Sequence, residues 1–189
     1  MFLGRRAFIA ALLVLPLPPG LADDRPDAEM RERLFRDLRN APTERAGRMA
    51  EDAVWRMWMA QAPTETVRLF VVDAMRKREI YDWDGALTIL NDVIEQAADY
   101  AEGYNQRAFI RFLKRDYDGS LSDIDKALEL EPLHFAALSG RALILLQQGR
   151  IDVGQKALRQ AVEIHPWLKE RSMLIPMPGE DLPGTGRGI

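Results

Sequence analysis

The chain has 189 residues, of which 47% are hydrophobic and 29% are charged, and its formal net charge is −3. This composition is typical of a folded globular protein, and the absence of a basic excess argues against nucleic acid as a partner. The chain contains no cysteine, which excludes disulfides, thiol nucleophiles, cysteine-ligated metal sites and the lipid attachment of a lipoprotein.

Residues 1–22 have the pattern of a signal peptide. Arg5 and Arg6 form a positive start, an apolar run follows from Ala7 to Leu15, and Ala22 ends a small-residue cleavage site. The nine apolar residues are too few to span a bilayer, which needs about 20. We therefore expect export to the periplasm, with secretion as an alternative, and no stable membrane anchor after cleavage. The arginine pair also resembles a twin-arginine signal, so the general secretory route and the twin-arginine route both stay open.

Residues 23–63 are predicted to form a helix pair that caps the repeats described next. Apolar residues recur at helical spacing from Met30 and again from Met49. Repeat stacks need atypical ends that cover the apolar face of a terminal unit, and this pair fits that role. Trp55 and Trp58 are interpreted as part of the capping core, with a binding surface as the alternative.

Three copies of a 34-residue pattern follow, at residues 67–100, 101–134 and 135–168. The eighth position of every copy is alanine, which lets a second helix cross close to the first. The twenty-fourth and twenty-seventh positions are apolar and three residues apart, so they share one buried helix face. Each copy therefore predicts a pair of helices. The residues at these three positions are Ala74, Ala108 and Ala142; Leu90, Ile124 and Leu158; and Val93, Ala127 and Ala161.

An aspartate occupies the eighteenth position of all three copies, at Asp84, Asp118 and Asp152. It precedes the second helix, and we predict that it caps the free N–H groups there, an interaction worth about 1 kcal/mol. Prolines at Pro132 and Pro166 are expected to end the second helix and to turn the chain.

Residues 67–166 resemble tandem tetratricopeptide repeats, with Tyr104, Ala108 and Pro132 among the residues that match the family pattern. The resemblance implies an all-α fold, a right-handed superhelical stack of about eight helices that binds other proteins. The stretch from Pro132 to Gly140 also resembles, more weakly, a subgroup of small exported repeat proteins of proteobacteria. The chain departs from the family at the seventh position, which is usually leucine. The residues there are Asp73, Arg107 and Arg141.

In this family, side chains of the first helix of each repeat line a concave groove. The resemblance implies a largely apolar groove here, which takes an apolar helix or extended segment of a protein or peptide partner. The alternative is that these side chains pack against neighbouring helices. Val71 and Met75 replace the polar residues with which some relatives clamp a C-terminal carboxylate, so that binding mode is disfavoured. The predicted groove residues are Asn105, Phe109, Phe112, Leu113, Ser139, Leu143 and Leu146.

Catalytic motifs find little support in the sequence. The chain has only two histidines, with no HExxH spacing, no Gly-x-Ser-x-Gly and no phosphate-binding glycine loop. Asp123 and Asp125 are expected to be solvated or to pair with Lys126 or Arg115, rather than to form a catalytic pair. We predict no catalysis, no cofactor and no metal site.

Residues 169–189 are predicted to form a short cap and a flexible tail, because proline and glycine recur there. A full solvating helix is missing at this end, so the last repeat is expected to expose apolar surface. Two functions are consistent with this pattern. The first is an exported scaffold or adaptor that binds partners in its groove; the alternative is a structural subunit of an envelope complex, held through its last repeat and tail.

Overall fold

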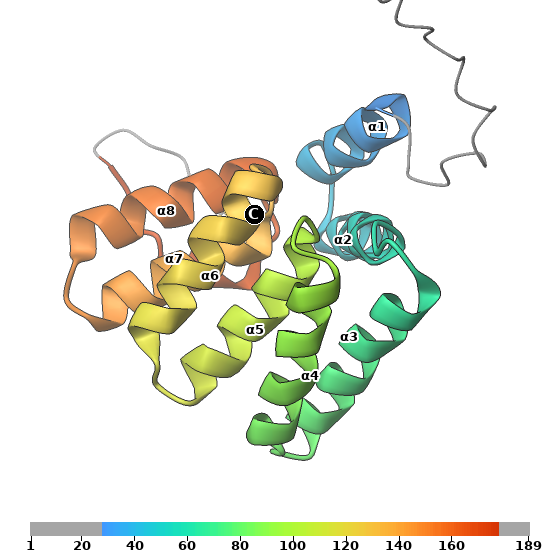
Figure 1. The fold of residues 1–189 in the computed structure, drawn as a ribbon. Coiled ribbons are helices and arrows are strands. Elements are labelled where there is room, and N and C mark those ends of the chain that lie inside the picture. The colour runs from blue at the N-terminus through green and yellow to red at the C-terminus, as the bar shows by residue number, and fades with distance from the viewer. Residues whose placement is uncertain (1–27, 178–189) are drawn as a thin grey trace, which may run out of the picture.

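Residues 28–177, which this computed structural model describes, form eight α-helices and one short 3₁₀ helix. The predicted signal peptide and most of the predicted tail lie outside these residues. The helices are α1 (Ala28–Arg39), α2 (Glu44–Ala60), α3 (Glu65–Glu79), α4 (Trp83–Gln96), α5 (Ala101–Leu113), α6 (Tyr117–Leu130), α7 (Phe135–Gln147), α8 (Ile151–Ile164) and η1 (Lys169–Met173). They pack in consecutive pairs (Figure 1), which confirms the predicted all-α fold class.

The pairs α5–α6 and α7–α8 fall within the second and third predicted 34-residue copies, and α3–α4 overlaps the first, except that α3 begins two residues before it, at Glu65. The alanine at the eighth position lies where the two helices cross, and all three alanines are at most 2% exposed. At the twentieth position the contact is closer still. Ser120 donates its hydroxyl to the carbonyl of Ala108 at 2.8 Å. A Cβ on Gly154 would lie 2.8 Å from the Leu146 side chain, so only glycine fits there.

The turn inside each repeat has the same left-handed residue. Tyr81, Arg115 and Gly149 occupy the fifteenth position, with φ angles of 62°, 63° and 74°. In each case the next residue donates its N–H to a carbonyl five residues earlier, at 2.9 Å. This is the Schellman end of a helix, which satisfies carbonyls that the helix leaves free. Only the third repeat uses glycine, although a left-handed conformation costs other residues about 1 kcal/mol.

The prediction that Asp84, Asp118 and Asp152 cap the second helices is wrong. In the first two repeats the cap lies two residues earlier, at Asp82 and Asp116, which accept from the backbone N–H three residues on at 3.0 Å. The left-handed turn residue ends the first helix, so the very next residue has the non-helical backbone that a cap requires. The predicted residues lie in the first helical turn, where their negative charge interacts favourably with the helix dipole.

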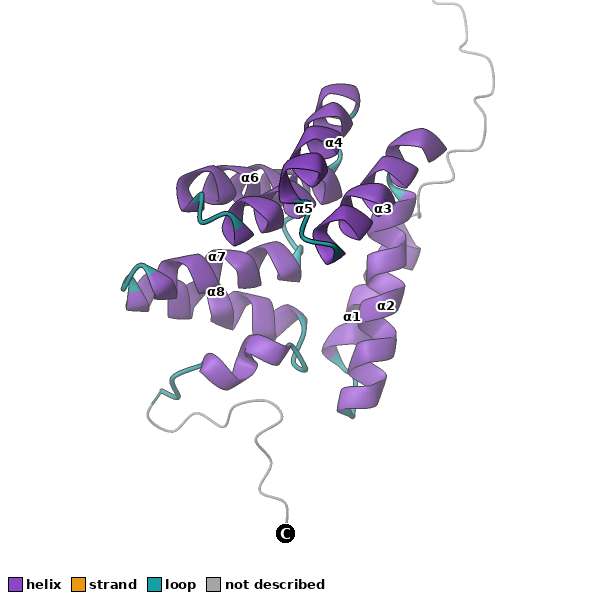
Figure 2. Ribbon diagram, turned by 90° about the horizontal axis from the view of Figure 1, so that it is seen from below, coloured by secondary structure: helices purple, strands orange, loops and turns teal. Residues whose placement is uncertain are grey.

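The helix pair α1–α2 folds back against the last repeat. Phe35 of α1 and Trp58 of α2 share one buried cluster with Phe135 of α7 and Leu158 of α8. Figure 2 shows α1 and α2 opposite α7 and α8, with the other four helices joining them. The first and last helices of the described chain are therefore in contact, α1 against α8. Trp58 is a core residue, as interpreted from the sequence.

Polar contacts reinforce this closure. Arg31 of α1 donates to both carboxylate oxygens of Glu131. The indole of Trp167 donates to the carbonyl of Ala41 at 2.8 Å, between α1 and α2. Leu168 and Leu174 are buried in the same cluster as Phe35. The expectation that the last repeat exposes its apolar side is wrong, because the N-terminal helix pair and the segment after α8 cover it.

Asp123 was expected to be solvated or to pair with Lys126 or Arg115, but it is buried. Its carboxylate accepts from Arg107 at 2.9 and 2.7 Å, and Arg111 lies 2.9 Å away. Asp125 pairs with Arg141 across to the next repeat. The charged seventh positions of the second and third repeats are thus explained, since each arginine pairs with an aspartate of α6.

Tyr100 joins α2 to the first repeat. It is buried immediately before α5, and its hydroxyl donates to the sulfur of Met59 in α2 at 3.7 Å. Around it lie Val67, Val71 and Val93 of α3 and α4. Burial raises the pKa of Tyr100 far above its ordinary value of 10.0, because the phenolate would lose its hydration.

The two aspartates before α6 give a direct test of the helix cap. We expect Asp116→Ala to lower the free energy of unfolding by about 1 kcal/mol, because it leaves an N-terminal N–H without an acceptor. Asp118→Ala should cost about half as much, because only a dipole interaction is lost. Urea denaturation followed by circular dichroism measures both values. Equal losses, or a larger loss at Asp118, would contradict the assignment.

The chain contains four tyrosines, and Tyr100 should ionise last. A phenol whose pKa is raised on folding stabilises the fold fully below its unfolded pKa, and this contribution is lost as the pH rises above about 10. We expect the wild type and Tyr100→Phe to show the same phenolate absorbance until alkaline unfolding begins. Only then should the wild type gain one further tyrosinate. A difference between the two proteins before unfolding would refute this.

Candidate partner-binding groove

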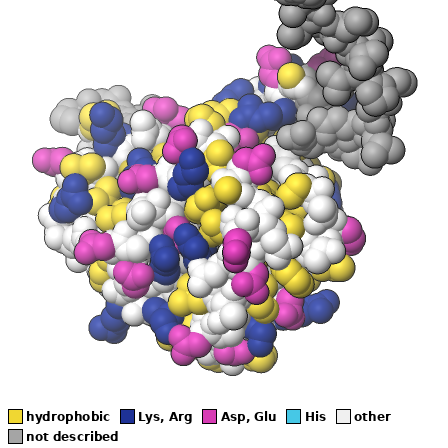
Figure 3. All heavy atoms as spheres, viewed as in Figure 1, with side chains coloured by type: hydrophobic (Ala, Val, Ile, Leu, Met, Phe, Trp, Pro, Cys, Tyr) yellow, Lys and Arg dark blue, Asp and Glu magenta, His cyan; other side chains and the backbone are white. Residues whose placement is uncertain are grey.

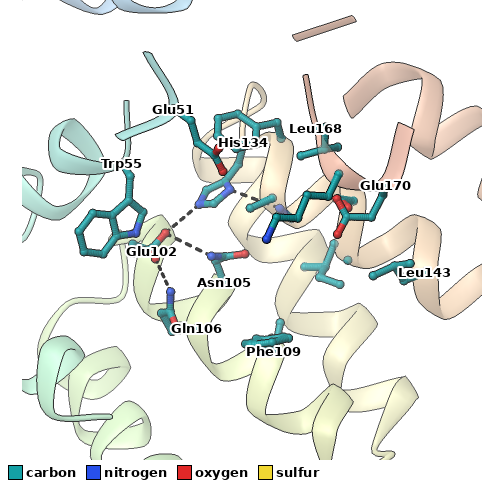
Figure 4. A pocket seen from close by; sticks show the side chains of 18 of the residues that line it. Glu51, Trp55, Glu102, Asn105, Gln106, Phe109, His134, Leu143, Leu168 and Glu170 are labelled. Atoms are coloured by element: carbon teal, nitrogen blue, oxygen red, sulfur yellow. Dashed lines mark hydrogen bonds and ion pairs between the residues drawn. The ribbon is translucent and has the colours of Figure 1, made fainter. Parts of the chain in front are cut away.

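A cavity of about 470 Å³ lies between α2 and the first helices of the second and third repeats, α5 and α7. The segment after α8, from Trp167 to Glu170, closes one side of it. We call this cavity, with the side chains that line it, the groove. Figure 4 shows three side chains that line the groove: Trp55 of α2, Phe109 of α5 and Leu143 of α7. Over the face shown in Figure 3, acidic and basic side chains are intermixed.

The floor of the groove is apolar. The ninth position of each repeat contributes one side chain: Met75, Phe109 and Leu143. Phe109 is 43% exposed, and its ring lies nearly parallel to that of Phe112, with centroids 6.5 Å apart. The guanidinium of Arg78 lies over the ring of Phe109, 5.1 Å from its centroid. A row of accessible apolar groups therefore runs along three consecutive repeats.

Five of the seven predicted groove residues line the cavity, and two do not. Leu113 packs against the buried cluster between α3, α4 and α5. Leu146 lies against Gly154 of α8, where the missing side chain leaves room for it. The twelfth position thus faces the groove in the second repeat and the α7–α8 contact in the third. The residues that line the groove are Asn105, Phe109, Phe112, Ser139 and Leu143.

One wall of the groove was missed in the sequence. Glu51, Asp52 and Trp55 of α2 line the cavity, together with Lys169 and Glu170. The stripe of apolar residues in α2 indicated a buried face but not what it packs against. The only signal was the alternative interpretation of Trp55 as a binding surface.

A buried polar network lies at the inner end of the groove (Figure 4). The Glu102 carboxylate, 1% exposed, accepts from Gln106 at 2.6 Å and from Asn105 at 3.3 Å, and lies 3.0 Å from Nε2 of His134. Nδ1 of His134 accepts the backbone N–H of Ala137 at 3.3 Å and so caps α7. The ring proton therefore lies on Nε2 and is donated to Glu102.

Trp58 covers this network from the α2 side. Its indole stacks on the His134 ring, with centroids 3.9 Å apart and planes 13° apart. Glu102, His134 and Trp58 thereby connect α5, α7 and α2, the three helices that form the groove. Because Asn105 donates its amide N–H₂ to Glu102, its carbonyl oxygen is left to face the groove.

The arrangement is suited to binding. The buried carboxylate, imidazole and amide satisfy one another, and the described groove presents no activated nucleophile beside a base. Within residues 28–177, no group of three His, Cys, Asp or Glu side chains is placed to hold a metal ion. What the groove offers a ligand is apolar area and a few oriented polar groups.

No protein-family model matches the chain. A TPR repeat-containing protein of Rhizobium etli is 32% identical over 155 residues, which cover 82% of this chain and 75% of that protein. The chain belongs to the tetratricopeptide repeat family. A tetratricopeptide repeat protein 36 homolog of Nematostella vectensis is 37% identical over 68 residues, 36% of this chain and 38% of that protein.

The crystal structure of MamA has the same fold as this tetratricopeptide repeat protein. The TM-score is 0.50 at 15% sequence identity, with 76% of this chain and 80% of the MamA chain covered. Tetratricopeptide repeat proteins generally act as scaffolds for protein–protein interaction and are usually not catalytic.

His134 should matter for stability more than any side chain that faces the open groove. His134→Ala removes the cap of α7, a donor to Glu102 and the surface on which Trp58 stacks. We expect the free energy of unfolding to fall by about 2–4 kcal/mol. His134→Asn keeps an oxygen for the cap and should cost clearly less. Chemical denaturation followed by tryptophan fluorescence measures both, and equal losses would contradict the role of the cap.

Proposed function

We propose that the protein is an exported scaffold or adaptor that binds a segment of another protein in the groove. The observation that carries this proposal is the open, apolar floor opposite α2, formed by Met75 of α3, Phe109 of α5 and Leu143 of α7. Pockets that bind ligands have this character: mostly apolar lining, with a few polar groups that set orientation. Membership of the family supports the proposal that the partner is a protein. The apolar groove supports the proposed place of binding.

Binding in the groove would use two kinds of contact. Apolar side chains of the partner would cover Phe109, which is far more exposed than an aromatic ring in a core. Asn105 and Ser139, at the same position of consecutive repeats, would hydrogen-bond to the partner's backbone. The network around Glu102 holds the three helices in place before the partner arrives. This lowers the entropy that binding costs.

The proposed location is the cell envelope, in the periplasm or outside the cell. Its support is the sequence of residues 1–22, with Arg5 and Arg6 before an apolar run. None of the helices within residues 28–177 combines the length and the apolar character needed to cross a membrane.

Export is tested by fusing residues 1–27 to alkaline phosphatase, an enzyme that is active only after it leaves the cytoplasm. We expect activity with the native segment and none when a charged residue interrupts the run from Ala7 to Leu15. Replacing both Arg5 and Arg6 with lysine should abolish export by the twin-arginine route and spare the general secretory route. An inactive native fusion would contradict export by the general secretory route.

A structural subunit held through the last repeat is the alternative function. It is favoured by one observation, an exposed apolar strip that begins at the last residue of η1. Met173, Ile175 and Met177 are 43%, 56% and 55% exposed. Gln155 of α8 holds this strip in place, bonding the carbonyl of Met173 at 2.9 Å and the N–H of Ile175 at 2.8 Å.

Photo-crosslinking in living cells separates the two functions. A benzophenone amino acid replaces Leu143 in the groove, Ile175 on the strip, or the exposed Leu69 on α3 as a control. We expect a defined partner to crosslink through position 143 alone. Phe109→Asp should remove that crosslink, because it places a charge on the apolar floor while disturbing little packing.

Circular dichroism and the melting temperature establish that Phe109→Asp is folded. Phe112→Asp is the second variant, with more buried packing at risk. Crosslinks through position 175 alone would contradict binding in the groove and support association through the strip. A crosslink at position 143 that persists in both folded variants would also contradict binding on the floor.

A further inference from the structure

The charged side chains around the groove are not balanced. Glu44 pairs with Arg48 at 2.5 Å, and their charges cancel. Arg78 and Glu102 both hydrogen-bond to the neutral Gln106, so each keeps its charge. Apart from Arg78 and Glu102, the remaining charged side chains are three acids and one base. They are Glu51, Asp52, Lys169 and Glu170.

The acids lie on two sides of the opening. Figure 4 places Glu51 on the side of Trp55, and Glu170 on the side of Leu143 and Leu168. Among residues 28–177, the carboxylate of Glu51 contacts one side chain, Nε2 of His165 at 3.3 Å. Asp52 is exposed and, within the described residues, has no partner of opposite charge. Five acids and three bases line the groove, so its border has an excess of negative charge, although Arg78 places one cation over Phe109.

Ser139 adds a polar group to the apolar floor. Ser139 lines the groove, is only 5% exposed, and its hydroxyl has no hydrogen-bond partner among the described residues. The hydroxyl oxygen is not fully buried, so water can make this hydrogen bond before a partner binds. A partner's backbone placed over Leu143 would supply that bond.

We propose that the groove selects a segment in which lysine or arginine flanks apolar side chains. The apolar side chains would cover Phe109 and Leu143, and the cations would reach Asp52 and Glu170. Glu51 and Trp55 lie four residues apart on one face of α2, so a cation there has a carboxylate and an aromatic face together. This inference rests on the proposed function and adds the chemistry of the partner.

Two matched peptides test it by fluorescence anisotropy. One is acetyl-Gly-Lys-Leu-Phe-Leu-Lys-Gly-amide with a dye, and the other replaces both lysines with glutamate. At low salt we expect the lysine peptide to bind about tenfold more tightly. Asp52→Asn and Glu170→Gln should each weaken it by about two- to fivefold, and Lys169→Gln should strengthen it. Added salt should narrow the difference between the peptides.

The outcomes separate this inference from the proposed function. If both peptides bind equally well and Phe109→Asp abolishes both, the groove remains the binding site, but the preference for basic residues is overturned. Binding of neither peptide would overturn both. Sedimentation that reveals a dimer broken by Phe109→Asp would identify a second copy as the occupant and overturn the inference as well.

Discussion

The indole of Trp58 lies flat on the imidazole of His134, and much of the structure depends on this buried contact. The imidazole also caps α7 and donates to Glu102 of α5. One ring therefore fixes α2, α5 and α7 relative to one another, and these are the three helices that surround the groove. The shape of the groove is set by buried side chains behind it. The exposed side chains of its floor are left free to serve a partner.

Much of the fold could be predicted because the repeat places small and apolar residues where geometry demands them. The helix ends were harder. The repeat position led to Asp118 as the cap, whereas the left-handed backbone at Arg115 places the cap at Asp116. The burial of Asp123 depends on arginines of the preceding helix, whose direction a linear pattern does not contain.

The groove, too, was only partly predictable from the sequence. Its floor follows from repeat positions, because equivalent residues of consecutive first helices face the same side. Its other wall does not. An apolar stripe on α2 shows that one face is buried, but many partners satisfy that requirement equally. That Trp58 meets His134, far along the chain, is settled only when all eight described helices are in place. Trp55 then becomes a wall of the groove.

The contact between α1 and α8 has a consequence for how the protein evolves and unfolds. In an open array each module touches only its neighbours, so stability is close to a sum over modules and the number of modules is free to vary. Here the two ends meet, and an extra module between them would separate Phe35 from Leu158. Module number is thereby held constant by geometry, and loss of either end removes the support of the other. The array behaves as one cooperative unit instead of a chain of semi-independent ones.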